Sequence, residues 1–433
     1  MINEIPRGKW QRSYTTGKTA AKISGKVLKY LAKRPFLSSG KKEQAKEDLD
    51  RDSAKILFSG LSLLKGTALK AAQMLSLELD IFPAHIRREL GKSYHQVPPI
   101  NRALVRRIIQ NNLKQPPEKV FRSFDTQAFA AASLGQVHRA ISLEGEELAV
   151  KIQYPDIANT ITSDIRLVKA AVRPLAEYEL VCIALKEIEE ILLLETDYEK
   201  EAANLEFFAK HLQMENVKIP EVDYRISGKT ILSQTHFHGP TLNEWLKTNP
   251  DRYEVDAVAQ TLHDIFLKGF YELNCIHADP NPGNFIILND CEIGLIDFGC
   301  VKRFDSKFVN LYNQLACISA NGEESLPLSL LRELEVFPPD MDTKVEQELY
   351  KYMVALNRWF GRPYQKEVFD FKENSDYILE GKEILKGIQR YRKHINSINT
   401  NFIFLDRTRY GLFRLFEQMG ARVRIRNKYE TKS

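Results

Sequence analysis

The stretch His277-Ala278-Asp279-Pro280-Asn281-Pro282-Gly283-Asn284, followed by Asp297-Phe298-Gly299, decides the fold of this chain. Asn284 comes five positions after Asp279, and Asp297 comes thirteen positions after Asn284. An aspartate placed like Asp279 can accept a proton from a hydroxyl group. The oxygen of an asparagine side chain and a second aspartate can hold Mg²⁺ on the phosphates of a nucleotide.

The residues on either side of this stretch support the same interpretation. Residues 255–274 have the apolar spacing of an amphipathic helix that leads into the loop. Two short apolar runs, 285–288 and 293–296, are separated by Asn289-Asp290, which is a hairpin signal. The two acidic residues therefore lie at opposite ends of a hairpin and close together in space. This order and spacing predicts the metal and phosphate site of a kinase fold.

The composition describes a soluble, mildly basic protein with ample apolar residues for a core. Of the 433 residues, 43% are hydrophobic and 27% are charged, and the formal net charge is +5. The cysteines form no CxxC pair and their number is odd, which favours a reducing compartment and argues against a metal cluster. No run of about 18 uncharged apolar residues is present, so we expect no membrane span.

The pattern of elements predicts an α+β fold: a protein kinase-like, two-lobed fold with an N-terminal helical extension. We expect the helical extension over residues 1–115, the kinase-like N-lobe over 116–238 and the mostly helical kinase-like C-lobe over 239–433. Alternation at 136–142 and 147–153 predicts two strands of the N-lobe sheet.

Three further segments fill in this pattern. Residues 101–113 read as a helix capped by Asn101, and residues 161–212 read as helix broken at Pro174. Residues 230–235 are strand-like, and they lead into the linker between the predicted lobes.

Lys151 is the predicted phosphate-binding cation. Its apolar neighbours in Leu148-Ala149-Val150-Lys151-Ile152 alternate, so its ammonium group lies on one face of a strand. In kinases such a lysine contacts the α- and β-phosphates of ATP and pairs with a glutamate of a helix. Glu195 and Glu201, from an acidic helical run, are the two candidates. We place Glu195 with Lys151 and Asp279 in the catalytic set, and the choice between the two glutamates stays open.

An alanine-rich segment stands where a kinase has its glycine-rich loop. Ala130, Ala131, Ala132 and Ser133 come just before the predicted strand 136–142, so we expect them to contact the nucleotide together with Lys151. Glycines let backbone N–H groups approach phosphates closely, whereas alanines permit less conformational freedom. The Ser133 hydroxyl could donate a hydrogen bond. A packed turn of small residues is the alternative.

Together these segments resemble the UbiB family of atypical kinases, also called the AarF/ADCK group. The resemblance covers residues 55–425 in the order of the family and rests mainly on segments 69–76, 130–140, 149–155, 195–204, 277–284 and 297–299.

The family's extension carries a Lys-x-Gly-Gln motif, which corresponds here to Lys70 and Gln73 with Ala72 in place of the glycine. Lys70 and Gln73 lie three positions apart, so they share a helix face. The resemblance implies that they belong, with Glu201, to a regulatory extension that covers the site where a protein substrate would dock. A second departure is Asn281, where the family often has histidine.

The resemblance implies an ATP-dependent enzyme of the atypical kinase type, with ATP or ADP and Mg²⁺ as cofactors and Asn284 and Asp297 as metal ligands. It also implies an unusual nucleotide selectivity and a role in ubiquinone or other isoprenoid-lipid metabolism. The expected partners are an isoprenoid or phenolic lipid, an anionic membrane surface and lipid-biosynthesis enzymes, and we expect no nucleic-acid partner.

Two alternative functions remain open at this stage. A small-molecule phosphotransferase of the aminoglycoside or choline kinase type shares the His-x-Asp loop and the same metal ligands. A nucleotide-gated lipid-binding scaffold would need no phosphotransfer. The extension helix and the alanine-rich loop argue against the first alternative, and the complete catalytic set argues against the second.

The N-terminal segment is basic, because Glu4 is its single acidic residue as far as Lys42. Its lysines recur at three- and four-residue steps, which predicts a basic stripe on a helix that contacts anionic lipid. We expect a cytoplasmic protein, peripheral on the inner membrane. A mitochondrial transit peptide, and hence the mitochondrial matrix, is the alternative.

Overall fold

The computed structural model describes residues 101–431, apart from 133, 174–177, 338–340, 390 and 392–399, together with isolated positions before residue 49. The contacts divide the chain into two units, described separately here. Unit 1 is Met1–Glu201 with Val222–His236, and unit 2 is Ala202–Glu221 with Phe237–Ser433. Lys70 and Gln73, with most of the predicted extension, lie outside the described residues.

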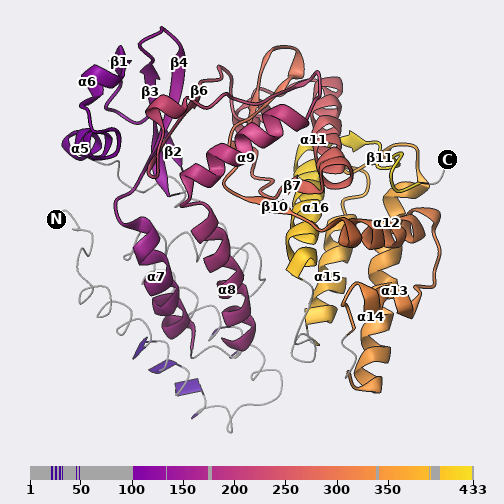
Figure 1. Cartoon of the computed structure of the whole chain (residues 1–433). Helices are drawn as coiled ribbons and strands as arrows, with labels where there is room; N and C mark the ends of the chain where they lie inside the picture. Colours follow the sequence, from indigo (N-terminus) through magenta and orange to yellow (C-terminus); the bar gives the residue numbers. More distant parts are fainter. Residues whose placement is uncertain are drawn as a thin grey trace. The chain divides into compact units, whose positions relative to one another are not determined.

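Unit 1 is built on an antiparallel sheet in the order β1-β3-β4-β6, with β2 paired to β3 (Figure 1). The strands are β1 (Ser123–Phe124), β2 (Ala130–Ala132), β3 (Gly135–Ile141), β4 (Glu147–Gln153) and β6 (Ile231–Thr235). The predicted strands at 136–142 and 147–153 are thus confirmed. Gly145 makes the turn between them with φ +97°, a conformation that glycine adopts without strain.

One face of this sheet packs on helix α5 (Arg102–Leu113). Asn101 caps that helix as predicted, because its side chain accepts a hydrogen bond from the backbone N–H of Ala103. The buried cluster joins residues of α5, the short helix α6 (Pro117–Val120) and alternate residues of β4, namely Val105, Ile109, Val120, Leu148, Val150 and Ile152. This burial leaves Lys151 and Ala149 on the opposite face of the strand.

The predicted helical stretch 161–212 is more broken than the sequence suggests. The structure has three helices, α7 (Ile157–Val172), α8 (Tyr178–Leu194) and α9 (Tyr198–His211). The additional break lies at Glu195–Asp197, because the Asp197 carboxylate accepts a hydrogen bond from the Lys200 backbone N–H and caps the new helix α9. In the sequence, a capping aspartate within a run of acidic residues looks like part of a continuous helix, so this break was not predicted.

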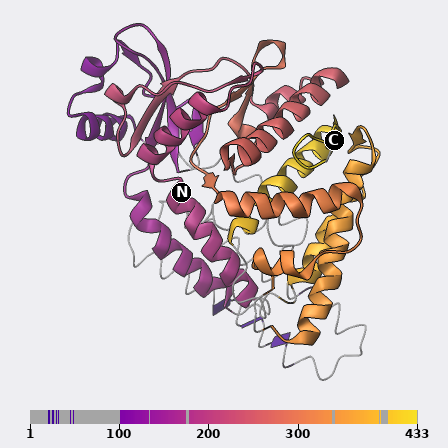
Figure 2. The same ribbon diagram turned by 45° about the vertical axis from the view of Figure 1, so that its right-hand side comes forward.

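Unit 2 is mostly helical and contains three small sheets. The first has the order β5-β9-β8, and the others pair β10 with β7 and β11 with β12. The strands are β5 (Val217–Lys218), β7 (Cys275–His277), β8 (Phe285–Ile287), β9 (Ile293–Leu295), β10 (Val301–Arg303), β11 (Phe369–Asp370) and β12 (Arg422–Val423). The helices are α10 (Leu242–Leu246), α11 (Arg252–Leu273), α12 (Ser306–Asn321), α13 (Leu328–Glu333), α14 (Thr343–Gly361), α15 (Tyr377–Gln389) and α16 (Thr400–Met419). Helices α14 and α15 lie side by side, and α16 packs along α11 (Figure 2).

Helix α11 confirms the helix predicted before the loop. A capping box starts it, in which Asp251 and Glu254 each accept a hydrogen bond from the backbone N–H of the other. Asn274 ends it in the left-handed conformation, with φ 49°. Gly269 lets this helix approach the next strand closely, since a Cβ there would lie 2.6 Å from the Cys275 carbonyl oxygen.

A buried polar cluster anchors the end of the described chain. Arg409 of α16 and Glu430 are almost fully buried and form an ion pair with a separation of 3.2 Å. The hydroxyl groups of Tyr271 and Tyr364 donate hydrogen bonds to the same Glu430 carboxylate. The carboxylate is therefore surrounded by donors, which offsets the desolvation of its charge.

We predict that acid destabilises the protein through His263 of α11. Burial lowers the pKa of this histidine from 6.5 to about 4. The unfolded state therefore binds its proton first as the pH falls below 6.5. Between pH 6.5 and pH 4 the free energy of unfolding should decrease by about 3 kcal/mol on account of this residue.

Denaturant unfolding across this pH range tests the prediction. His263→Leu should remove this part of the slope, because leucine occupies a similar volume without titrating. An unchanged slope in the folded variant would contradict the prediction.

Candidate functional site

The pairing of two short strands in unit 2 holds the predicted catalytic segments. Strand β7 (Cys275–His277) runs antiparallel to β10 (Val301–Arg303), with His277 opposite Val301. The Ala278 backbone N–H donates a hydrogen bond of 2.8 Å to the Cys300 carbonyl and continues the ladder by one step. The loop that follows β7 and the turn that precedes β10 are therefore neighbours.

Asp279 and Asn284 are joined directly. The Asn284 amide donates hydrogen bonds to the Asp279 carboxylate at 2.9 Å and to its backbone carbonyl at 3.3 Å. Asn281 shapes the loop between them, because its side chain accepts a hydrogen bond from the Gly283 N–H at 3.0 Å. Asn281 thus caps the turn η4 (Pro282–Asn284). Because Asn284 donates through nitrogen, its side-chain oxygen remains suited to a cation.

The Asp297-Phe298-Gly299 turn is fixed through the phenylalanine. Phe298 is fully buried, and its ring centroid lies 5.1 Å from that of Phe208 on α9 and 5.5 Å from that of His277. The Asn204 amide donates a hydrogen bond of 3.1 Å to the Phe298 carbonyl. The position of the Asp297 carboxylate therefore follows from the packing of the residue after it.

His277 and Asn204 are positioning residues to which the sequence alone assigned no role. The His277 ring donates a hydrogen bond from Nε2 to the Asp297 carbonyl, which ties the end of β7 to the turn that contains Asp297. Asn204 follows Glu201 by three positions on α9, so both side chains lie on one helix face. The three-residue spacing of Glu201 and Asn204 within the acidic segment is the sequence signal that could have indicated the positioning role of Asn204.

Lys151 of β4 forms its ion pair with Glu201 in unit 1. The Lys151 Nζ lies 2.5 Å from the Glu201 Oε1, and both side chains are almost fully buried, with 7% and 3% exposure. Glu201, rather than Glu195, is thus the acidic partner of Lys151 in the structure. Glu195 follows the last residue of α8 at the break, whereas Glu201 lies in the first turn of α9.

The alanine-rich segment forms a hairpin in the structure. Ala130–Ala132 pair with Gly135–Val137 of β3, and Ala130 is exposed, while Ser133 lies outside the described residues. Gly135 is required by close packing, because a Cβ there would lie 2.3 Å from the Ile152 carbonyl oxygen. A contact of the alanines with a nucleotide stays a prediction.

The residues of unit 2 fit a magnesium ion by the chemistry of their donors. Mg²⁺ prefers oxygen ligands, usually one or two carboxylates with substrate phosphates and water. Asn284 and Asp297 offer an amide and a carboxylate from adjacent segments, and one Asp297 oxygen accepts a hydrogen bond of 3.1 Å from the Gly299 N–H. These two side chains are the oxygen donors that the two segments offer to a cation.

Comparison with known proteins also indicates a kinase-like domain. A family model described as the ABC1 atypical kinase-like domain matches residues 92–325, more than half of the chain. The probable serine/threonine-protein kinase abkA of Dictyostelium discoideum is 27% identical over 90% of this chain and 72% of its own length. The mitochondrial atypical kinase COQ8 of Schizosaccharomyces pombe is 29% identical over 76% of this chain and 54% of its own length.

A solved structure resembles nearly the whole chain. It is that of an Rv3197–erythromycin complex from Mycobacterium tuberculosis, with a TM-score of 0.58 and 25% sequence identity. The match covers 89% of this chain and 96% of the other.

The buried ion pair predicts a large difference between two glutamate substitutions. Glu201→Gln leaves the Lys151 ammonium group buried without its carboxylate, so the free energy of unfolding should fall by about 3–5 kcal/mol. Glu195→Gln is the matched control and should lose much less. Denaturant unfolding measures both. A loss at Glu195 that equals or exceeds the loss at Glu201 would show that the pairing is wrong.

Proposed function

Because this chain belongs to the ABC1 atypical kinase-like family, the group of the UbiB, AarF and COQ8 proteins, we propose that it binds Mg-ATP and acts as an ATP-dependent kinase or ATPase. One observation carries the proposal. The direct hydrogen bond between Asp279 and Asn284 lies beside the Asp297 turn, and the fully buried Phe298 holds that turn in place.

Each residue has a distinct task in this proposal. Lys151, oriented by Glu201, binds the phosphates of the nucleotide. Asn284 and Asp297 hold Mg²⁺, which supplies positive charge for the phosphate oxygens. Asp279 orients the attacking hydroxyl group or water and accepts its proton. The amide of Asn284 keeps the Asp279 carboxylate in one orientation, so the acceptor oxygen is preorganised.

We propose that the alanine-rich hairpin influences nucleotide preference. Alanine methyl groups between the backbone amides and the phosphates should restrict the hairpin to one conformation. Ala131→Gly should therefore relax it and change the ratio of ATP affinity to ADP affinity. Affinities for both nucleotides that stay within about twofold, near 0.4 kcal/mol, would limit the segment to a packing role.

The physiological role that we propose is support of ubiquinone or other isoprenoid-lipid metabolism at a membrane surface, with an isoprenoid or phenolic lipid as ligand. The COQ8 relative is named a mitochondrial atypical kinase, which supports a role in an organelle. Among the described residues, none of the helices is both long and apolar enough to span a bilayer. Profiling of isoprenoid quinones in a deletion strain, complemented with wild type or Asp297→Asn, tests this role.

A second candidate function is binding or modification of a hydroxylated small molecule. The similar structure described as an erythromycin complex favours it, since that ligand carries several hydroxyl groups. Steady phosphorylation of a macrolide or an aminoglycoside, abolished by Asp279→Asn, would establish a small-molecule phosphotransferase. Tight macrolide binding without turnover would instead indicate a small-molecule-binding scaffold.

We predict that Asp297→Asn abolishes most of the stabilisation by Mg-ATP. At a nucleotide concentration one hundred times its Kd, wild type should gain about 2.7 kcal/mol of stability. A variant that binds one hundred times more weakly should gain about 0.4 kcal/mol. Thermal-shift titration measures the difference.

Asp290→Asn is the matched control for this prediction. Asp290 lies in the turn between β8 and β9 with φ 54°, a conformation that asparagine also adopts, so this variant should respond like wild type. Equal stabilisation of Asp297→Asn and wild type by Mg-ATP would refute the assignment of Asp297.

A further inference from the structure

Glu147 and His236 are direct neighbours at one end of the sheet of unit 1. Strands β4 and β6 pair with Leu148 opposite Thr235, and the ladder continues one step further. The His236 backbone N–H donates a hydrogen bond of 3.0 Å to the Glu147 carbonyl. Residues directly opposite each other in an antiparallel pair present their side chains on the same face. The Glu147 carboxylate and the His236 imidazole therefore share one side of the sheet.

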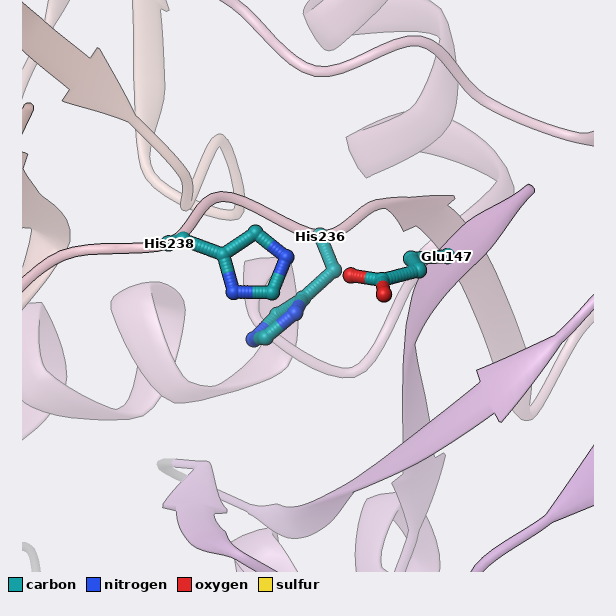
Figure 3. Close-up of side chains that lie close together, drawn as sticks. All are labelled: Glu147, His236 and His238. Carbon is teal, nitrogen blue, oxygen red and sulfur yellow. The ribbon is translucent and has the colours of Figure 1, made fainter.

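His238 follows on the same segment of chain. Two residues span at most about 7 Å, so the hydrogen bond that fixes His236 also keeps His238 within reach of Glu147. One ligand atom from each of Glu147, His236 and His238 lies within 4.8 Å of the other two. Figure 3 shows the carboxylate and both imidazole rings gathered at the start of β4. The ring of His236 also packs edge-on against Phe129, with centroids 5.3 Å apart, which restricts its orientation.

We propose that Glu147, His236 and His238 form a binding site for a divalent transition metal of the Zn²⁺ type. Two imidazole groups and one carboxylate are a ligand set that Zn²⁺ prefers, and a fourth position remains for water. Magnesium is disfavoured here, because it selects oxygen ligands. The site is therefore chemically distinct from the oxygen site at Asn284 and Asp297, and it does not depend on the proposed function.

The geometry requires a modest adjustment of the side chains. Ligands about 2.1 Å from a tetrahedral metal lie about 3.4 Å from one another. The three atoms, which lie within 4.8 Å of one another, therefore have to approach by at most about 1.4 Å. Glu147 and His238 are exposed, so rotation of their side chains can provide this movement without repacking a core.

Titration of the purified full-length chain with Co²⁺ tests the proposal. Excess Mg²⁺ fills the oxygen sites, and the visible absorption bands of Co²⁺ report a tetrahedral environment. Wild type should bind one ion that Zn²⁺ displaces. His236→Gln, His238→Gln and Glu147→Gln should each weaken binding at least tenfold. His238→Cys should retain binding, because a thiolate is also a ligand for these metals.

Two controls separate this site from others. His211→Gln removes an exposed histidine of α9 and should leave Co²⁺ binding unchanged. Asp297→Asn should also bind Co²⁺ like wild type, even if it no longer responds to Mg-ATP. Thermal midpoints without metal confirm that each variant is folded. Binding that is equal in wild type and the three glutamine variants, or absent from wild type, would overturn the proposal.

Discussion

The antiparallel pairing of β7 with β10 is the constraint on which the candidate site depends. It places the segment after His277 beside the turn that contains Asp297, although Asp279 and Asp297 lie eighteen positions apart in the sequence. The hydrogen bond from the His277 ring to the Asp297 carbonyl strengthens the same link. Burial of Phe298 then fixes the turn from the other side. The Asp297 carboxylate is thus positioned by backbone pairing and an aromatic core, together with the hydrogen bond that it accepts from the Gly299 N–H.

The second constraint lies within unit 1, where Lys151 and Glu201 are both buried. Burying a charge away from water is costly unless an opposite charge lies next to it. The buried ion pair therefore fixes the first turn of α9 against β4. Asn204 lies on the same helix and holds the Phe298 carbonyl in unit 2. Helix α9 therefore carries the partner of Lys151 and, one turn later, a residue that holds the turn containing Asp297.

Much of this fold was predicted from local patterns, because these elements are determined by residues that lie close together in the sequence. Helix α11, the hairpins of β3 with β4 and of β8 with β9, and the Asp279–Asn284 loop follow from periodicity, caps and turn residues. The break between α8 and α9 was missed, since an aspartate cap within an acidic run resembles a solvated helix face. The choice between Glu195 and Glu201 depends on which of them faces β4, and that follows from the break. The roles of His277 and Asn204 depend on contacts with distant backbone carbonyls, which no local pattern reveals.

The central claim is the proposal that Asn284 and Asp297 of unit 2 hold one magnesium ion on a bound nucleotide. A double-mutant cycle on Mg-ATP affinity tests it most directly, with Asn284→Ala, Asp297→Asn and the double variant measured by calorimetry. If both residues bind one metal ion, their effects should be coupled by about 0.5–3 kcal/mol, the range that groups in one site show. Effects that add within about 0.3 kcal/mol, or wild-type affinity in either single variant, would contradict the account.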